Sequence, residues 1–179
     1  MTRITRHLSS TPDARWTEQP AGSAAAGEAA LALTGARHQT WEGFGGCFNE
    51  LGWIALAGLD DTARQQVIAA LFDPQGGCRF SHARLPIGAS DYAAEWYSHN
   101  EHDGDFAMAH FAIDRDRRYL IPYIKMALAL RPDLTLFASP WSPPTWLKCP
   151  KVYNYGTLIW EPRYLAAYAD YFVKFVQAY

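Results

Sequence analysis

The sequence has few cysteines, little excess charge and no metal-binding motif. Its 179 residues include only three cysteines, Cys47, Cys78 and Cys149, which are far apart and form no Cys-x-x-Cys pair. This spacing argues against a disulfide framework and against a zinc site. Sixteen basic and eighteen acidic residues leave a net charge of −2. That charge provides no electrostatic basis for binding nucleic acid or an anionic membrane.

Long hydrophobic runs are absent as well. The first 16 residues contain no apolar stretch that could serve as a signal peptide. The segment AGSAAAGEAALAL is interrupted by Glu28 and is too short to span a bilayer. We therefore expect a cytoplasmic protein without a membrane span. His99 and His102 form one close histidine pair in a polar loop, which is too little to predict a metal site, and we expect no cofactor.

The glycine cluster GFGGCFNE lacks the lysine that follows the glycines of a nucleotide-binding P-loop. A dinucleotide-binding pattern begins at Gly43 and Gly45, but Phe48 occupies the place of its third glycine, and Glu50 would repel a pyrophosphate. We therefore expect a strand whose glycines let neighbouring backbones pack closely, with Glu50 at its carboxyl end. From these residues alone, Glu50 is either a ligand-facing group or a solvated loop acid.

Strand and helix patterns alternate three times from residue 42 onward, which predicts an α/β fold with a parallel sheet. We expect strands at the glycine cluster, at 81–87 and at 134–139. Helices are expected to begin at residue 60 or 61, to cover 119–128, and to begin near Pro162. In a β/α barrel the loops that follow the strands build the active site. A doubly wound open sheet produces the same alternation, so the pattern leaves both architectures open.

The amino-terminal part of the chain differs in composition from the rest. Residues 1–28 are rich in small and polar residues, and we expect a loose lead-in there. Residues 29–41 contain two short stretches, Leu31–Leu33 and His38–Trp41, that we expect to form strands.

The last predicted helix has no stop signal. No glycine, proline or basic last turn ends it, and its apolar stripe continues to the last residue. The expected stripe consists of Leu165, Tyr168, Phe172, Phe175, Val176 and Tyr179. Three βα units are also fewer than the eight that close a barrel. We therefore expect residues 42–179 to be the first part of a barrel, in a truncated chain.

Charged and aromatic residues lie in or after the later two strands. Arg84 inside an apolar strand would be costly unless a carboxylate paired with it. Asp91 lies just after the same strand. The stretch SPWSPPTWLK follows the last strand, and its prolines would hold the indoles of Trp141 and Trp146 at low entropic cost, as a sugar-stacking surface requires. Packing of these indoles on the core is the alternative.

Taken together, GFGGCFNE, RLPIGASDY and ASPWSPPTWLK resemble the amino-terminal part of the glucosylceramidase-like enzymes of glycoside hydrolase family 30. The resemblance runs from about Gln39 to Tyr179. It implies a (β/α)8 TIM barrel with an attached β-domain, to which the strands of 29–41 would belong. It also implies retaining hydrolysis of β-glycosides in carbohydrate or glycosphingolipid metabolism. By matching position, the resemblance implies that Glu50, Asp91 and Trp141 bind the sugar substrate.

The residues that would perform the hydrolysis are not in this sequence. Retaining glycosidases use two carboxyl groups about 5 to 5.5 Å apart. In the family that the chain resembles, the acid/base is the glutamate of an Asn-Glu-Pro after the fourth strand, and the nucleophile follows later. Glu161 also precedes a proline, but we expect that proline to begin a helix, and we assign no catalytic residue. We expect an incomplete glycosidase, inactive alone, that pairs with a chain supplying the rest of the barrel. The alternatives are a non-catalytic carbohydrate-binding module and a degenerate fragment.

Overall fold

The computed structural model describes residues 6–20 and 34–179, and the chain divides into two units at Thr40–Trp41. In the first unit, β1 (His7–Ser9) pairs antiparallel with β2 (Thr17–Gln19). The turn between these strands is closed by Thr11, whose N–H donates to the carbonyl of Ala14 at 2.8 Å. A short hairpin therefore occupies part of the segment for which a loose lead-in was expected.

The described part of the segment 29–41, residues 34–41, contains no strand. Leu31–Leu33 lie outside the described residues, and the prediction of a strand at His38–Trp41 is wrong. Residues 38–41 are exposed and take part in no strand pairing, so their backbone groups are open to water and have no neighbouring strand to hold them extended. That this region belongs to an attached β-domain stays a prediction.

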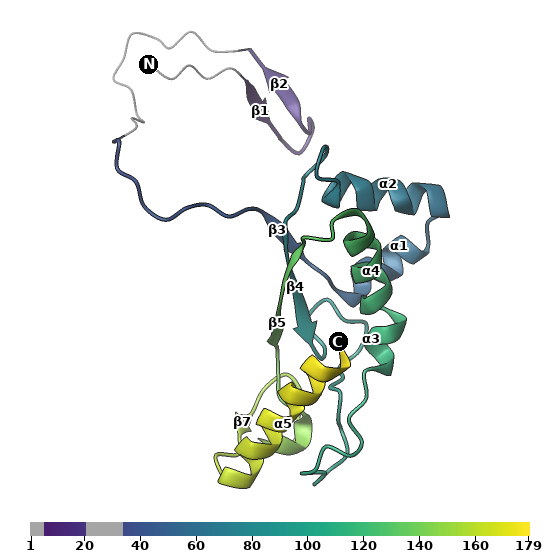
Figure 1. Ribbon diagram of the computed structural model, residues 1–179, viewed down its shortest axis with the longest axis vertical. Coiled ribbons are helices and arrows are strands. Elements are labelled where there is room, and N and C mark those ends of the chain that lie inside the picture. Colours follow the sequence, from purple (N-terminus) through teal and green to yellow (C-terminus); the bar gives the residue numbers. More distant parts are fainter. Residues whose placement is uncertain (1–5, 21–33) are drawn as a thin grey trace. The chain divides into compact units, whose positions relative to one another are not determined.

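The second unit contains a parallel three-stranded sheet, as predicted (Figure 1). Its strands are β3 (Gly45–Cys47), β4 (His82–Ile87) and β5 (Thr135–Pro140), in that spatial order. The helices are α1 (Glu50–Ala57), α2 (Asp61–Phe72), α3 (Asp114–Arg118), α4 (Leu120–Leu130) and α5 (Pro162–Ala178). A 3₁₀ turn (Thr145–Leu147) and the small hairpin of β6 (Lys148–Cys149) and β7 (Thr157–Leu158) lie between β5 and α5. The arrangement is part of a β/α barrel that is not closed, because β3 and β5 each have one unpaired edge among the described residues.

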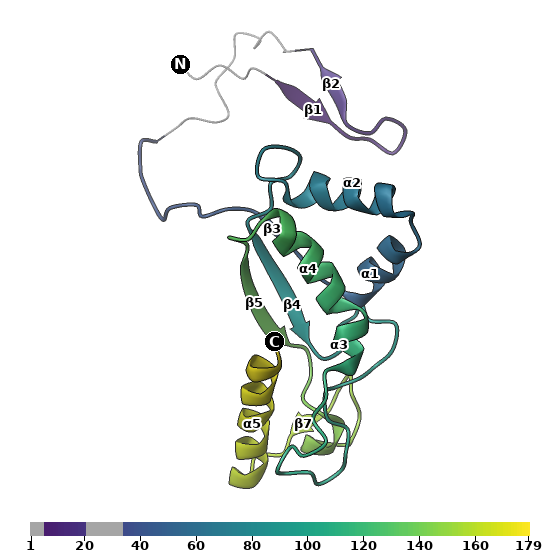
Figure 2. The same ribbon diagram turned by 45° about the vertical axis from the view of Figure 1, so that its right-hand side comes forward.

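One face of the sheet packs against helices. Alternate residues of β4 (Ala83, Leu85 and Ile87) are buried in a single core with residues of α2 and α4. Figure 2 shows α1, α2 and α4 on the same side of the three strands. The opposite face carries Arg84 and Phe137, which are paired in register, and Phe137 is 55% exposed. The sheet thus has one covered face and one open face.

The glycine cluster has the role predicted for it. A Cβ at Gly45 would overlap with the backbone carbonyl oxygen of His82 on the neighbouring strand. No side chain fits at that distance, so glycine is required for β3 to pair with β4. The positive φ of Gly88, +80°, similarly allows the turn that follows β4.

The helix at residue 61 is confirmed, but an earlier helix was missed. Asp60 caps α2, its Oδ1 accepting from the Ala63 N–H at 2.8 Å. In the same way, Asn49 caps α1 by accepting from the Gly52 N–H at 2.7 Å. Glu50 is therefore the first residue of a helix and does not end a strand. The local signal was present, since Asn directly before an apolar run is a typical helix start.

The buried face of α5 also differs from the predicted stripe. Its buried residues are Ala167, Tyr171 and Phe175, whereas Val176 is 73% exposed. Tyr171 is buried against the long loop after β4, where its ring stacks on His99 with ring centroids 5.9 Å apart and its hydroxyl accepts a hydrogen bond from the His99 N–H at 3.2 Å. This partner is 72 residues away in sequence, so the helical period alone could not identify it.

Candidate functional site

The carboxyl ends of β3, β4 and β5 lie at one edge of the sheet, because the strands are parallel. We call the residues that directly follow these ends the rim. Glu50, Asp91 and Trp141 all belong to loops or helices that begin at the rim. Their side chains nevertheless have quite different surroundings.

The carboxylate of Glu50 is almost completely buried, with 2% of the side chain exposed. It forms an ion pair with Arg115, whose Nη2 lies 2.9 Å from Oε1, and Oε2 accepts from the Ala94 N–H at 3.1 Å. Its place in the first turn of α1 is also favourable for an acid. Glu50 thus connects α1 to α3 and to the loop after β4. Its predicted sugar contact stays a prediction, and it would compete with the Arg115 ion pair.

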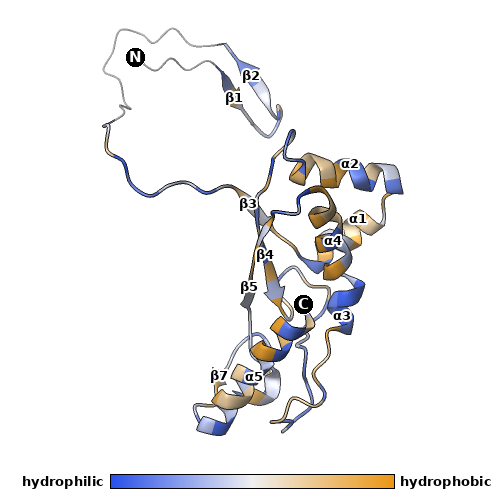
Figure 3. Cartoon of the chain, viewed as in Figure 1, coloured by the Kyte–Doolittle hydropathy of each residue, from blue (hydrophilic) through white to orange (hydrophobic). Residues whose placement is uncertain are grey.

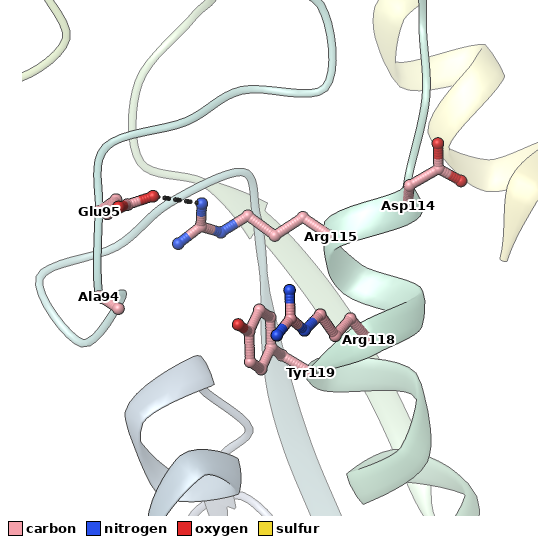
Figure 4. A pocket seen from close by; sticks show the side chains of 6 residues that line it. All are labelled: Ala94, Glu95, Asp114, Arg115, Arg118 and Tyr119. Carbon is pink, nitrogen blue, oxygen red and sulfur yellow. Dashed lines mark hydrogen bonds and ion pairs between the residues drawn. The ribbon is translucent and has the colours of Figure 1, made fainter.

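Arg115 also borders a cavity of about 580 Å³ (Figure 4). The second terminal nitrogen of Arg115 lies 2.9 Å from the Glu95 carboxylate, and its guanidinium stacks on the Tyr97 ring at 4.6 Å. Figure 3 shows that α3, which supplies Arg115, is almost entirely hydrophilic. Further residues that line the cavity are Ala94, Asp114, Arg118 and Tyr119. Because charges of both signs line it, the cavity favours neither an anion nor a cation.

Arg84 does not have the carboxylate partner that the sequence led us to expect. In residues 34–179 its contacts are a hydrogen bond from Nε to Ser139 Oγ at 2.6 Å and a cation–π contact with Trp141 at 5.9 Å. The Cys47 thiol lies 4.0 Å from Nη1. Arg84 is only partly buried on the open face of the sheet, so water can solvate its charge without a counter-ion.

Trp141 and Trp146 have opposite roles. Trp141 is 50% exposed at the rim, with its ring beside the Arg84 guanidinium. Trp146 is 2% exposed, and its Nε1–H donates to the Asn100 carbonyl at 3.0 Å, which makes it a core residue. Of the two indoles only Trp141 can present a flat face to a ligand.

Asp91, in the loop after β4, is exposed. Burial raises the pKa of the Cys47 thiol, Arg84 opposes this shift, and the negative charge of Asp91 adds to it. The backbone carbonyl of the neighbouring Tyr92 accepts a hydrogen bond from the Leu51 N–H at 3.0 Å. The structure therefore brings Trp141 to Arg84 at the rim, and turns Glu50 toward α3.

Two residues in the segments after β4 and β5 were missed by sequence reasoning. Trp96, in the loop after β4, is 56% exposed and stacks on Tyr153, with ring centroids 5.3 Å apart. Lys148, in β6, is buried. An aromatic residue in a polar loop after a strand was a signal for Trp96, but nothing local marks a lysine as buried.

The described residues, 6–20 and 34–179, offer neither a metal site nor a membrane-spanning helix. They contain no group of three His, Cys, Asp or Glu side chains placed to hold a metal ion. Across the same residues, every helix is too short or too polar to cross a membrane.

Comparison with known proteins identifies the source of the resemblance. Residues 41–179 match the model of the glycosyl hydrolase family 30 TIM-barrel domain. A Caenorhabditis elegans protein named as a candidate glucosylceramidase is 35% identical over 146 residues, which are 80% of this chain and 28% of that protein. An endo-1,6-β-D-glucanase of Neurospora crassa is 30% identical over 149 residues, 80% of this chain and 31% of that protein.

A solved structure gives the same picture. SrfJ from Salmonella typhimurium superposes with a TM-score of 0.73 and 30% identity, over 79% of this chain and 31% of SrfJ. The chain therefore spans less than a third of the length of these relatives.

Proposed function

The chain belongs to glycosyl hydrolase family 30, and from this membership we propose that it forms part of the sugar-binding rim of a glucosylceramidase-like, retaining β-glycosidase. The observation that carries this proposal is the half-exposed Trp141 ring at the end of β5, held beside Arg84. An indole face suits the apolar C–H face of a pyranose, and burying it against a ligand is favourable. The exposed carboxylate of Asp91 would accept hydrogen bonds from sugar hydroxyls.

The proposed substrate is a β-linked glucoside. The name of one relative refers to glucosylceramide and that of another to a β-1,6-glucan, and glucose is common to both. The acid/base and nucleophile are proposed to lie on strands outside this chain. Support comes from the rim, where Glu50 is occupied by Arg115, and from Glu161, which directly precedes the first residue of α5. A retaining mechanism needs two carboxyl groups about 5 to 5.5 Å apart, and the Glu50 carboxylate is already paired with Arg115.

We expect Trp141→Ala to weaken binding of gentiobiose, a β-1,6-linked glucose disaccharide, about tenfold, because the stacking surface is lost. Titration followed by tryptophan fluorescence and calorimetry would measure the dissociation constant. Trp41→Ala is the matched control, since Trp41 is 68% exposed and precedes β3 at the opposite end of the sheet. Equal effects of the two substitutions, or no binding by the unmodified chain, would contradict the proposal.

The purified chain is expected not to hydrolyse 4-nitrophenyl β-D-glucoside, although it binds the sugar. Release of nitrophenolate by this chain, abolished in the Glu50→Gln variant, would show that the catalytic groups are present after all. Sugar binding without hydrolysis is also what a non-catalytic binding module would give, so the next experiment tests completion of the barrel.

We propose that a chain carrying the remaining barrel strands covers the open edge of β5. Supporting observations are the exposed Leu136 and Phe137 on this strand, 37% and 55% exposed, and the small share of the relatives that the chain spans. Co-expression with the remaining barrel segment of SrfJ is expected to yield a co-purifying complex. Phe137→Asp should abolish it, whereas Gln66→Asp, at an exposed position of α2, should not. A failure of the unmodified chain to co-purify would argue for a degenerate fragment.

A further inference from the structure

Lys148 is a buried cation without a counter-ion. Its residue is 5% exposed, and within the described part of the second unit no carboxylate lies within 4.0 Å of its ammonium group. Burial lowers the pKa of Lys148, and the charge of Glu101 opposes this shift. Burying an ammonium group is costly unless its N–H groups are used. The acceptors of the hydrogen bonds from Lys148 therefore identify the segments that its ammonium group holds in place.

The ammonium group of Lys148 ties two parts of the segment after β5 together. Its Nζ donates to Ser142 Oγ at 2.9 Å and to the Tyr153 carbonyl at 2.8 Å. The Ser142 hydroxyl donates to the same carbonyl at 2.7 Å. Ser142 directly follows Trp141, so these bonds fix the backbone at the residue next to the one that carries the rim indole.

Tyr153 extends this connection to the loop after β4. Its hydroxyl donates to the Ala89 carbonyl at 2.6 Å, and its ring stacks on Trp96 with an interplanar angle of 28°. Gly88 leaves room for this contact, because a Cβ there would lie 3.2 Å from the Tyr153 hydroxyl. One buried cation is thus connected, through Ser142 and Tyr153, to exposed indoles on two different loops.

We propose that Lys148 is a positioning residue of the rim, and that its ammonium group holds Trp141 and Trp96 in fixed places as two parts of one sugar-stacking surface. The part that concerns sugar rests on the proposed function. The part that concerns the two indoles can be measured without any sugar. A purely structural lysine would affect stability without this selective effect on two side chains.

The first experiment uses the full chain labelled with 5-fluorotryptophan and observed by ¹⁹F NMR, with resonances assigned from single Trp→Phe variants. In Lys148→Met the resonances of Trp96 and Trp141 are expected to shift or broaden. Those of Trp41 and of Trp53, in α1, should stay in place and report an intact fold. Lys151→Met, which removes an exposed lysine paired with Asp103, is the matched control and should change neither rim resonance. Unchanged Trp96 and Trp141 resonances in a folded Lys148→Met chain would overturn the proposal.

Two milder variants keep the test decisive if Lys148→Met does not fold. Ser142→Ala should move the Trp141 resonance more than that of Trp96, because Ser142 directly follows Trp141 and reaches Trp96 only through Tyr153. Tyr153→Phe retains the stacked ring but loses the bond to Ala89, so it should move Trp96 more than Trp141. If either variant moved both resonances equally, or neither, the described connection through Lys148 would be wrong.

A double-mutant cycle then tests the role in sugar binding. Lys148→Met is expected to weaken gentiobiose binding about fivefold in the unmodified chain and to have no further effect when Trp141 is already alanine. Equal weakening in both backgrounds would show that Lys148 does not act through Trp141. If no variant binds gentiobiose, the proposed function fails, while the NMR result still decides whether Lys148 positions the indoles.

Discussion

Replacing Arg115 by methionine is expected to lower the free energy of unfolding by about 3 kcal/mol. The substitution leaves the Glu50 carboxylate, 2% exposed, without its counter-ion, while the Ala94 N–H remains its hydrogen-bond donor. A buried charge that loses its partner cannot recover the solvation it had in the unfolded chain. Chemical denaturation monitored by circular dichroism would measure the loss.

The second carboxylate bound to Arg115 provides the control. Glu95 is 74% exposed, so Glu95→Gln should change the free energy of unfolding by less than about 1 kcal/mol. Adding Glu50→Gln to Arg115→Met should recover part of the loss, because the unpaired charge is removed. A similar small effect of Arg115→Met and Glu95→Gln would mean that Glu50 is solvated, and hence available to a sugar.

Replacing Asp116 by alanine is expected to lower the free energy of unfolding by about 3 kcal/mol. Asp116 is completely buried and accepts hydrogen bonds from the Tyr97 hydroxyl at 2.8 Å and the Tyr179 hydroxyl at 2.6 Å. Alanine would leave the partly buried Tyr97 hydroxyl without this acceptor, at about 1–3 kcal/mol, and would add a smaller loss at Tyr179, which is 43% exposed. Asp114→Ala is the matched control, since Asp114 lies on the same short helix and is exposed. Thermal or chemical unfolding that fails to separate the two variants would contradict this role.

Asp116 and His99 also make stability depend on pH in opposite directions. Burial raises the pKa of the Asp116 carboxyl, while His99 and the two tyrosine hydroxyls oppose the shift. Burial lowers the pKa of His99, while Asp116 opposes that shift. The His99 Nε2 accepts from the Gly88 N–H at 3.2 Å, which assigns the ring proton to Nδ1 in the neutral form. The fold thus favours the neutral form of both side chains.

The folded and unfolded states bind protons differently, and this difference sets the direction in which stability changes with pH. The stability that Asp116 contributes is full below about pH 4 and is lost as pH rises through its raised pKa. The contribution of His99 is full above about pH 6.5 and is lost as pH falls through its lowered pKa. Between pH 4 and 7, the free energy of unfolding of Asp116→Asn should therefore rise with increasing pH when it is compared with that of the unmodified chain. The free energy of unfolding of His99→Gln should rise with decreasing pH in the same comparison. Parallel pH profiles for all three proteins would contradict this assignment.

Local sequence was sufficient for the main elements of the second unit. Glycines in the cluster predicted close strand pairing, and the overlap that a Cβ at Gly45 would cause with the His82 carbonyl confirms it. Asp60 predicted the start of α2, and the alternation of strand and helix predicted the parallel sheet. These features depend on neighbouring residues and on short-range backbone geometry, which a sequence displays directly.

Tertiary structure alone decided the partners of the polar side chains. Glu50 could not be assigned a protein partner from spacing, and its carboxylate binds Arg115, 65 residues later, while its sugar contact stays a prediction. Arg84 was expected to need a carboxylate, but it lies on the open face beside Ser139 and Trp141. Lys148 carried no local sign of burial. A side chain's partner depends on which distant segments the fold brings together, and residue type and spacing do not encode that distance. The sequence therefore determined the three parallel strands, most of the helices and their order, and the fold determined which charges face one another.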